Sequence, residues 1–207
     1  MPWISLSLDD AGALLRRLLR PIDWLVAPEW FVTNVARVPT AGLEPTPPPG
    51  VSVRLGSVSD DAEALARLVH GRESLAWRFA RGDVVLVAEV DGQVVGCTWL
   101  TNQPLRPSYF PIKVEPKPGE WYNYGLVLLP AFRGRGLGRI LSRSAMAEAS
   151  RRGGDVVFGH ARRFSGVAAA SHTAAGFVTV DDMLGIKVLD RFVVVLYRRR
   201  RRPVRRA

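Results

Sequence analysis

The stretch Leu126–Gly138 constrains the fold most, because an apolar run ending at Pro130 passes into a loop with glycine at alternate positions. The apolar run predicts a buried strand, and the apolar spacing that begins at Leu137 predicts a helix. Glycine lets the backbone turn sharply and approach a ligand closely. A helix start also presents unpaired N–H groups, which favour negative charge. The sequence therefore predicts a strand–loop–helix unit able to hold a phosphate group.

Two well-known phosphate-binding loops fit this stretch poorly. A P-loop ends in Gly-Lys-Ser or Gly-Lys-Thr, and this loop does not. A dinucleotide-binding loop needs G-x-G-x-x-G and an acidic residue at the end of the next strand. Here the glycines are Gly134, Gly136 and Gly138, and Asp155 falls at the start of the next predicted strand. A different family of loops must be considered.

The rest of the chain predicts alternating strands and helices. The dipeptide Asp91-Gly92 suits a two-residue turn between two strands, and the proline-rich stretch from Thr101 to Gly119 predicts irregular structure. Period-two alternation and apolar runs predict strands at 51–55, 84–90, 93–100, 121–129, 156–160, 177–180 and 192–197. Helical spacing predicts helices at about 60–69, 72–80, 137–151 and 165–175.

The loop and the order of elements resemble the GNAT superfamily of acyl-CoA-dependent N-acyltransferases. The coenzyme A loop of that family, Q/R-x-x-G-x-G/A, is matched by Arg133, Gly136 and Gly138, and Gly176-Phe177 matches the closing pair of the family. The resemblance implies an α/β single domain with a central, twisted, mixed but mostly antiparallel sheet. It implies about six or seven strands flanked by helices, preceded here by an N-terminal helical extension.

The resemblance also implies transfer of an acetyl or another short acyl group, with acetyl-CoA as cosubstrate and an amine, on a small molecule or a protein, as acceptor. Backbone around Leu126 and Leu128 is expected to hold the pantetheine and the acyl oxygen. Ser165 stands where the family often has an asparagine facing the coenzyme, although a simple helix cap also explains it. The pyrophosphate is expected to lie on the loop residues Arg133, Gly134, Arg135, Gly136, Leu137 and Gly138, with Arg139 adding charge.

The reaction implied is direct attack of an amine on the thioester in a ternary complex. Because an ordinary amine has a pKa near 10.4, a base or desolvation must supply its neutral form. Family members often carry a glutamate where this chain has Tyr122, which is a departure from the pattern. Glu120 lies on the same strand face and is the candidate base, directly or through water. Glu120 could instead be an ordinary exposed charge at the start of a strand. Tyr122 is a candidate catalytic residue, although it also suits the wall of a pocket.

The leaving thiolate needs a proton, which many family members supply from a tyrosine four residues before the Gly-Phe pair. His172 stands at that position, and histidine can donate a proton near neutral pH. A thiol leaves easily, so the acid can be dispensable, and His172 then becomes a coenzyme contact or an ordinary helix residue. His160 ends a strand near the same cleft and is a spare candidate.

Both ends of the chain fall outside the resemblance. Residues 1–50 are predicted to form an N-terminal extension with a proline-rich linker, 51–197 the acyltransferase domain, and 198–207 an arginine-rich tail. Apolar residues at helical spacing after Ser7 predict a helix that ends at Pro21. The extension also carries aromatic residues that we expect to pack on the main domain, on a second copy or around the substrate pocket: Trp24, Trp30 and Phe31.

The net charge of +10 comes mainly from the tail. The simpler interpretation is that the tail is a solvated chain end. The more specific one is that its positive charge binds nucleic acid, the ribosome or an anionic membrane surface. The tail arginines have no interleaved aromatic residues, so a dedicated single-strand binder is disfavoured. Nucleic acid is therefore a less favoured partner.

Several function classes lack sequence support. Cys97 is the single cysteine, which excludes an intramolecular disulfide, and the three histidines lack metal-ligand spacing, so no metal site is expected. No apolar run approaches the roughly 20 residues of a membrane span, and the start lacks a secretory signal pattern. We expect a cytoplasmic protein and consider a homodimer possible, since pairing is common in the family. Because the usual glutamate and tyrosine are missing, a non-catalytic acyl-CoA-binding module is the alternative function.

Overall fold

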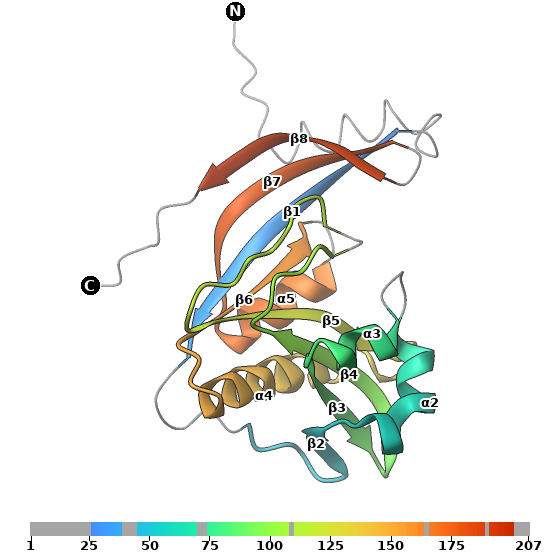
Figure 1. Ribbon diagram of the computed structural model, residues 1–207. Helices are drawn as coiled ribbons and strands as arrows, with labels where there is room; N and C mark the ends of the chain where they lie inside the picture. Colours follow the sequence, from blue (N-terminus) through green and yellow to red (C-terminus); the bar gives the residue numbers. More distant parts are fainter. Residues whose placement is uncertain are drawn as a thin grey trace, which may run out of the picture.

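An eight-stranded sheet forms the centre of the computed structural model, in the order β2-β3-β4-β5-β6-β1-β7-β8 (Figure 1). Neighbouring strands are antiparallel except β5 and β6, which run parallel. In chain order the strands are β1 (Val26–Arg37), β2 (Val51–Leu55), β3 (Val84–Val90), β4 (Gln93–Thr101), β5 (Glu120–Leu128), β6 (Val156–Arg162), β7 (Val178–Val188) and β8 (Arg191–Arg200). The predicted mixed, mostly antiparallel sheet is confirmed.

The structure describes residues 26–38, 45–69, 74–107, 110–163, 166–188 and 191–200. The predicted helix between Ser7 and Pro21 lies outside these ranges, as do Trp24 and the candidate coenzyme contact Ser165. Much of the proline-rich linker and the residues from 201 onward lie outside them too.

Helices cover both faces of the sheet. The long helix α4 (Leu137–Arg151) packs on β3, β4 and β5, with α5 (Gly166–Ala175) beside it. The opposite face is covered by α2 (Val58–Leu68) and the short α3 (Leu75–Ala80). A turn of 3-10 helix, η2 (Pro130–Phe132), links β5 to the glycine loop. The sheet therefore has two apolar cores, one under α4 and one under α2 and α3.

Strand β1 corrects the predicted domain boundary. The sequence analysis placed Val26–Arg37 in an extension, whereas it pairs antiparallel with both β6 and β7 inside the sheet. Trp30 and Phe31 are buried there, so they pack as strand residues and not from a docked helix. Pro28 and Glu29 interrupt the apolar pattern of this segment, which is why strand alternation did not stand out. The strand also brings the described sheet to eight strands.

Strand β8 corrects the predicted start of the tail. The tail was expected from Arg198, but β8 continues to Arg200, with Arg199 and Arg200 opposite Asp182 and Asp181 of β7. The first arginines of the run therefore belong to a strand at the edge of the sheet. Arginine is an uncommon strand residue in a run of this kind, so the composition suggested an unstructured end.

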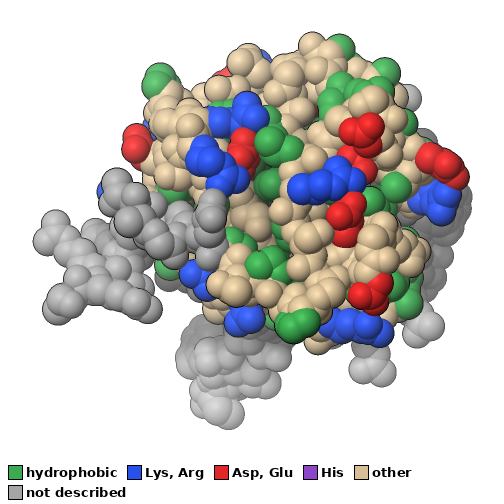
Figure 2. All heavy atoms as spheres, turned by 90° about the horizontal axis from the view of Figure 1, so that it is seen from below, with side chains coloured by type: hydrophobic (Ala, Val, Ile, Leu, Met, Phe, Trp, Pro, Cys, Tyr) green, Lys and Arg blue, Asp and Glu red, His purple; other side chains and the backbone are tan. Residues whose placement is uncertain are grey.

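The face seen from below in Figure 1, around β2, α2 and α4, carries charges of both signs. Figure 2 shows lysine and arginine side chains lying beside aspartate and glutamate side chains across this surface. Interspersed charges do not build the single-sign field that attracts a polyanion. The described residues of this face therefore form no patch of a single charge sign.

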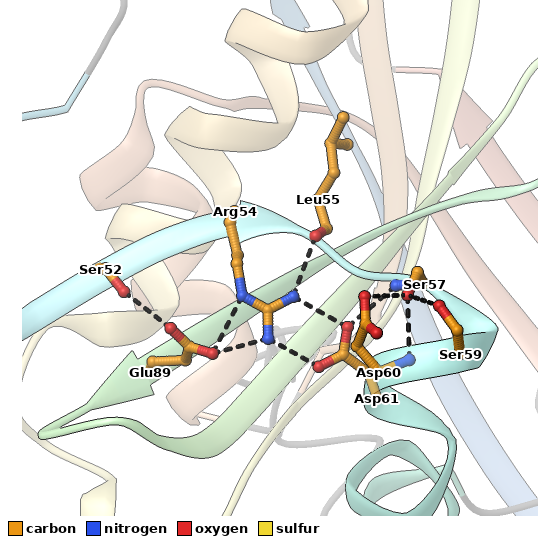
Figure 3. Close-up of polar contacts among 8 residues, drawn as sticks. All are labelled: Ser52, Arg54, Leu55, Ser57, Ser59, Asp60, Asp61 and Glu89. Carbon is orange, nitrogen blue, oxygen red and sulfur yellow. Dashed lines mark hydrogen bonds and ion pairs between the residues drawn. The ribbon is translucent and has the colours of Figure 1, made fainter.

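A network around Arg54 fixes α2 to the edge of the sheet (Figure 3). The Arg54 guanidinium donates to both Asp61 oxygens, at 2.9 and 2.7 Å, and to Glu89 Oε1 at 2.7 Å. Asp61 is only 1% exposed, and its hydrogen bonds from Arg54 hold its pKa below the usual range. Ser57 caps α2, and its N–H donates to Asp61. These contacts hold the start of α2 against β2 and β3.

Candidate functional site

Strands β5 and β6 diverge at the middle of the sheet. Three residue pairs join them, from Glu120 opposite Val156 to Tyr122 opposite Phe158, while β5 runs on to Leu128 paired only with β4. Residues 125–128 are half-buried, although β5 is an interior strand of the sheet. The divergence therefore opens one edge of β5 over its second half and leaves its backbone groups available to a ligand.

A bulge at Gly125 sets which way the side chains at this gap point. Gly125 has φ of 61°, and the register with β4 shifts beside it. A bulge inserts one residue and reverses the alternation after it. Tyr122 and Tyr124 accordingly belong to the core under α2 and α3, while Leu126 and Leu128 pack toward α4. The sequence analysis missed this bulge, although a glycine within a strand pattern is its usual signal.

The glycine loop is open to solvent on the side that faces away from the sheet. Gly134 and Gly136 both have φ of 77°, and a Cβ added at either would meet no atom within 4 Å. Gly136 caps α4, whose hydrogen-bond ladder starts with Ile140 N–H donating to the Gly136 carbonyl at 3.2 Å. The preceding first-turn amides have no intrahelical acceptor, so the loop presents free donors at the positive end of a helix.

Two further residues of the motif connect the loop to its surroundings. A Cβ on Gly138 would lie 2.7 Å from Ser171 Oγ, so this glycine allows α4 and α5 to approach closely. Arg133 donates from Nε to the Leu128 carbonyl at 3.2 Å, which links the loop to the end of β5. The loop arginines Arg133, Arg135 and Arg139 are exposed. The residues present therefore fit an anionic, pyrophosphate-bearing ligand.

Glu120 lies away from the gap. It is the first residue of β5, on the paired side of Tyr122, and its Oε2 accepts from the Lys117 N–H at 3.0 Å. At about 3.3 Å per residue, Gly125 lies about 16 Å further along the strand. Glu120 lines a separate polar hollow with Lys117 and Arg152. The structure does not bring it beside the gap, and its role as base stays a prediction.

Tyr122 and His160 meet where the two strands part. Tyr122 is fully buried, and its hydroxyl lies 3.2 Å from His160 Nδ1 on β6. His160 is half-buried and stacks on Phe110 at a centroid distance of 3.7 Å. Tyr122 in turn stacks on Tyr124 at 5.7 Å. A titratable imidazole, held by a phenol, thus lies at the point where an amine could enter the gap.

His172 is held as a neutral, buried imidazole. Its Nδ1 accepts from Asn34 Nδ2 at 2.9 Å, and Asn34 Oδ1 accepts from Thr179 Oγ1 at 2.8 Å. Burial lowers the pKa of His172 to about 4, so little of it is protonated at pH 7. The ring also stacks on Phe177 at 4.9 Å. The acid role stays a prediction, and no sequence signal pointed to Asn34, which lies on the strand that was not foreseen.

Residues 58–177 match the model of the acetyltransferase (GNAT) family. The chain belongs to the acetyltransferase (GNAT) family. This confirms the family resemblance and the enzyme class expected from it, and acetyl-CoA is the cosubstrate that membership brings. The match includes the diverging strands, the glycine loop and α4, so the geometry described above lies inside the part that carries the family pattern.

Solved structures share the fold at low sequence identity. A GNAT-family protein from Novosphingobium aromaticivorans is 19% identical with a TM-score of 0.55, over 77% of this chain and 64% of its own. A GCN5-related N-acetyltransferase from Kribbella flavida is 15% identical with a TM-score of 0.51, over 83% of this chain and 72% of its own. The Salmonella typhimurium protein yncA, solved with its cofactor acetyl-CoA, is 19% identical with a TM-score of 0.50, over 68% of this chain and 94% of its own. No curated protein sequence matches this chain.

Other kinds of site find little support among the described residues. Burial raises the pKa of the Cys97 thiol to about 12, so it is a small core residue and not a nucleophile. Within the described ranges, no group of three or more potential ligands is arranged to hold a metal ion. No described helix is both long enough and apolar enough to cross a membrane.

Proposed function

We propose that this enzyme transfers the acetyl group of acetyl-CoA to the amine of its acceptor at the gap between β5 and β6, in a ternary complex. One observation carries the proposal. Pairing of β5 and β6 stops at Tyr122, and the open half of β5 leads directly into a loop with two positive-φ glycines and a free helix start. The loop suits a pyrophosphate and the open strand suits an extended thiol arm, so one ligand can use both.

The binding roles follow from these positions. The pyrophosphate lies on the amides of residues 134–138, with charge from Arg133, Arg135 and Arg139. The pantetheine arm and the acyl oxygen take the backbone around Leu126 and Leu128. Support comes from the half-buried state of these leucines and from the absence of any atom where a Cβ on Gly134 or Gly136 would lie.

When bound, acetyl-CoA supplies a thioester already activated toward attack. A neutral amine forms the new C–N bond, the C–S bond breaks, and one proton must pass from nitrogen to the departing sulfur. We assign His160 as the group that takes this proton, because it is half-buried at the mouth of the gap. Tyr122 positions the imidazole through the 3.2 Å contact with its Nδ1. Glu120 remains the alternative base, acting through water.

Release of coenzyme A thiol tests the proposal, measured with acetyl-CoA and a panel of amines. We expect release that needs both substrates. His160→Gln should lower kcat by about 10²- to 10⁴-fold, as loss of a general base does. Glu120→Gln should leave kcat unchanged. The opposite pattern assigns the base to Glu120.

Acetyl-CoA binding without amine-dependent thiol release would refute the transferase proposal. The chain would then be an acyl-CoA-binding regulatory module. A role of the tail in binding RNA is tested separately by deleting residues 201–207, since Arg200 still belongs to β8. Unchanged RNA binding at low salt would remove that alternative. A homodimer and a cytoplasmic location stay predictions, the first open to sedimentation measurements.

A further inference from the structure

His172 of α5 lies over a glycine at the point where β5 and β6 part. The pairing of these strands ends at Tyr122 and Phe158, so Gly159 is the first residue of β6 beyond it. A Cβ on Gly159 would lie 2.9 Å from the Asn123 carbonyl of β5, and 3.5 and 3.8 Å from Cε1 and Nε2 of His172. Because Gly159 has no side chain, the imidazole can lie at the closed end of the gap.

Asn34 holds the same ring from the other side of β6. It stands opposite Gly159 in the pairing of β1 with β6, and it is only 3% exposed. Its Nδ2 donates to His172 Nδ1 at 2.9 Å. The two ring nitrogens direct their bonds away from each other, and β6 separates β1 from β5 in the sheet (Figure 1). His172 Nε2 therefore faces the β5 side, where the gap opens.

These contacts determine which ring nitrogen carries the hydrogen. A neutral imidazole has a hydrogen on one nitrogen and a lone pair on the other. Burial keeps His172 neutral at pH 7, and its Nδ1 accepts from Asn34, so the hydrogen is on Nε2. Asn34 Oδ1 accepts from Thr179 Oγ1 at 2.8 Å, which holds the amide in this orientation.

Nε2 of His172 is accessible from the gap. It has no hydrogen-bond partner among the described residues, yet it is not one of their fully buried side-chain atoms that lack a partner. Part of its surface is therefore open. Under the proposed function the glycine loop holds the pyrophosphate beyond the far end of β5, so the thiol end of the pantetheine arm points toward the closed end of the gap. The sulfur and Nε2 then meet.

We propose that His172 donates a hydrogen bond from Nε2 to the leaving sulfur, and that Asn34 is the positioning residue that keeps the hydrogen on Nε2. The inference rests on the proposed function. As the amine bonds to the acyl carbon, the C–S bond breaks and its electron pair goes to sulfur. His160 takes the proton of the amine, and the thiolate takes a proton from water after release. The N–H of His172 stabilises the thiolate and stays on the ring, as preorganised donors do at developing charge.

The tautomer of His172 is the first test, measured by long-range ¹H–¹⁵N NMR. The chain has three histidines, and His172→Gln assigns the signal. We expect the hydrogen on Nε2 in the parent at neutral pH. Coenzyme A should shift the Nε2 resonance more than its desulfo analogue does, because only coenzyme A brings a sulfur to this nitrogen. A hydrogen on Nδ1, or equal shifts by the two ligands, overturns the proposal.

Asn34→Asp reverses the hydrogen bond at nearly constant shape. A carboxylate can only accept, so it moves the hydrogen to Nδ1, and its charge raises the pKa of His172. Above that pKa Nε2 carries no hydrogen, and kcat for thiol release should fall by about 10- to 100-fold, the effect of losing a hydrogen bond to a charged group. Below it the imidazolium again carries a hydrogen on Nε2, and the loss should be small.

The ratio of parent to variant kcat should therefore grow as the pH rises through this pKa, which the same NMR titration measures. A merely structural defect lowers kcat equally at every pH, and that result overturns the proposal. Asn102→Asp is the matched control, because it makes the same substitution at an exposed residue whose Oδ1 accepts from Gln103 Nε2. The control should keep the tautomer and the pH profile of the parent, and a pH-dependent loss in it as well would overturn the proposal.

If Asn34→Asp does not fold, the tautomer and the sulfur-dependent shift in the parent still decide. Failure of the proposed function is seen separately. No acetyl-CoA binding in calorimetry, or binding without amine-dependent thiol release, overturns the proposed function and this inference with it. Amine-dependent release by a parent with the hydrogen on Nδ1 overturns only the inference.

Discussion

Replacing Gly136 with aspartate and with asparagine separates the charge of the glycine loop from its shape. Both side chains are the same size, both tolerate a left-handed backbone better than most residues do, and φ is 77° at this position. A Cβ there meets no atom within 4 Å, so the Cβ of either residue has room. The two variants therefore share the backbone strain and differ only in one negative charge.

The size of that difference follows from Coulomb's law. A carboxylate about 5 Å from a pyrophosphate carrying two charges repels it by about 1.7 kcal/mol in a water-like dielectric, and by more where the loop excludes water. Acetyl-CoA should therefore bind the Gly136→Asp variant at least about 15-fold more weakly than the Gly136→Asn variant in low salt. The difference should shrink at 1 M salt, where the Debye length is about 3 Å.

Isothermal calorimetry with acetyl-CoA at two salt concentrations measures both effects. Thermal unfolding of the two variants checks that they are equally stable. Equal affinities of the Asp and Asn variants at low salt would refute the reasoning, because the pyrophosphate could not then lie on this loop. A difference that persists unchanged at 1 M salt would also refute it, since a charge effect at an exposed loop must be screened.

Three further predictions concern stability. Burial lowers the pKa of His172 from 6.5 to about 4, so the unfolded state binds more protons than the folded state between these pH values. The free energy of unfolding therefore falls as the pH drops from 6.5 to 4. His172→Gln should remove about 3 kcal/mol of this loss, measured by urea unfolding at pH 7 and pH 4. Arg54→Met leaves the Asp61 carboxylate buried without its guanidinium and should cost about 1–3 kcal/mol at pH 7. Because hydrogen bonds from Arg54 lower the pKa of Asp61, this cost should shrink as the pH falls and the carboxylate becomes protonated. Gly138→Ala should lower Tm through its contact with Ser171, and adding Ser171→Ala should restore part of the loss.

The fold was predictable wherever local pattern and tertiary structure agree. The turn at Asp91-Gly92, the hairpin around it and helix α4 follow from turn chemistry and apolar spacing, and the structure has them at nearly the predicted residues. Strand β1 could not be read in the same way. Its partners, β6 and β7, lie more than a hundred residues away along the sequence, and Pro28 breaks its pattern.

The candidate site also has one part that local sequence predicts and another part that depends on tertiary structure. The glycine loop is local, so its residues could be named from the sequence, and the open backbone at Gly134 and Gly136 agrees with that assignment. The proton-handling residues depend on which strands meet. Glu120 was chosen because it lies two residues before Tyr122 on the same strand face, but hydrogen bonding to Lys117 holds it at the closed end of β5. His160 was only a spare candidate in the sequence, because its contact with Tyr122 joins two strands that are far apart along the chain.

Gly125 decides which way the second half of β5 faces. If β5 had no bulge at Gly125, period-two alternation would turn Leu126 and Leu128 toward the same face as Tyr122 and away from α4. The glycine also leaves room for Arg78, whose Nη1 would lie 3.1 Å from any Cβ at that position. A side chain at Gly125 would therefore strain the positive φ of the bulge and press on Arg78 at the same time. The proposed place of the pantetheine arm at Leu126 and Leu128 depends on this bulge.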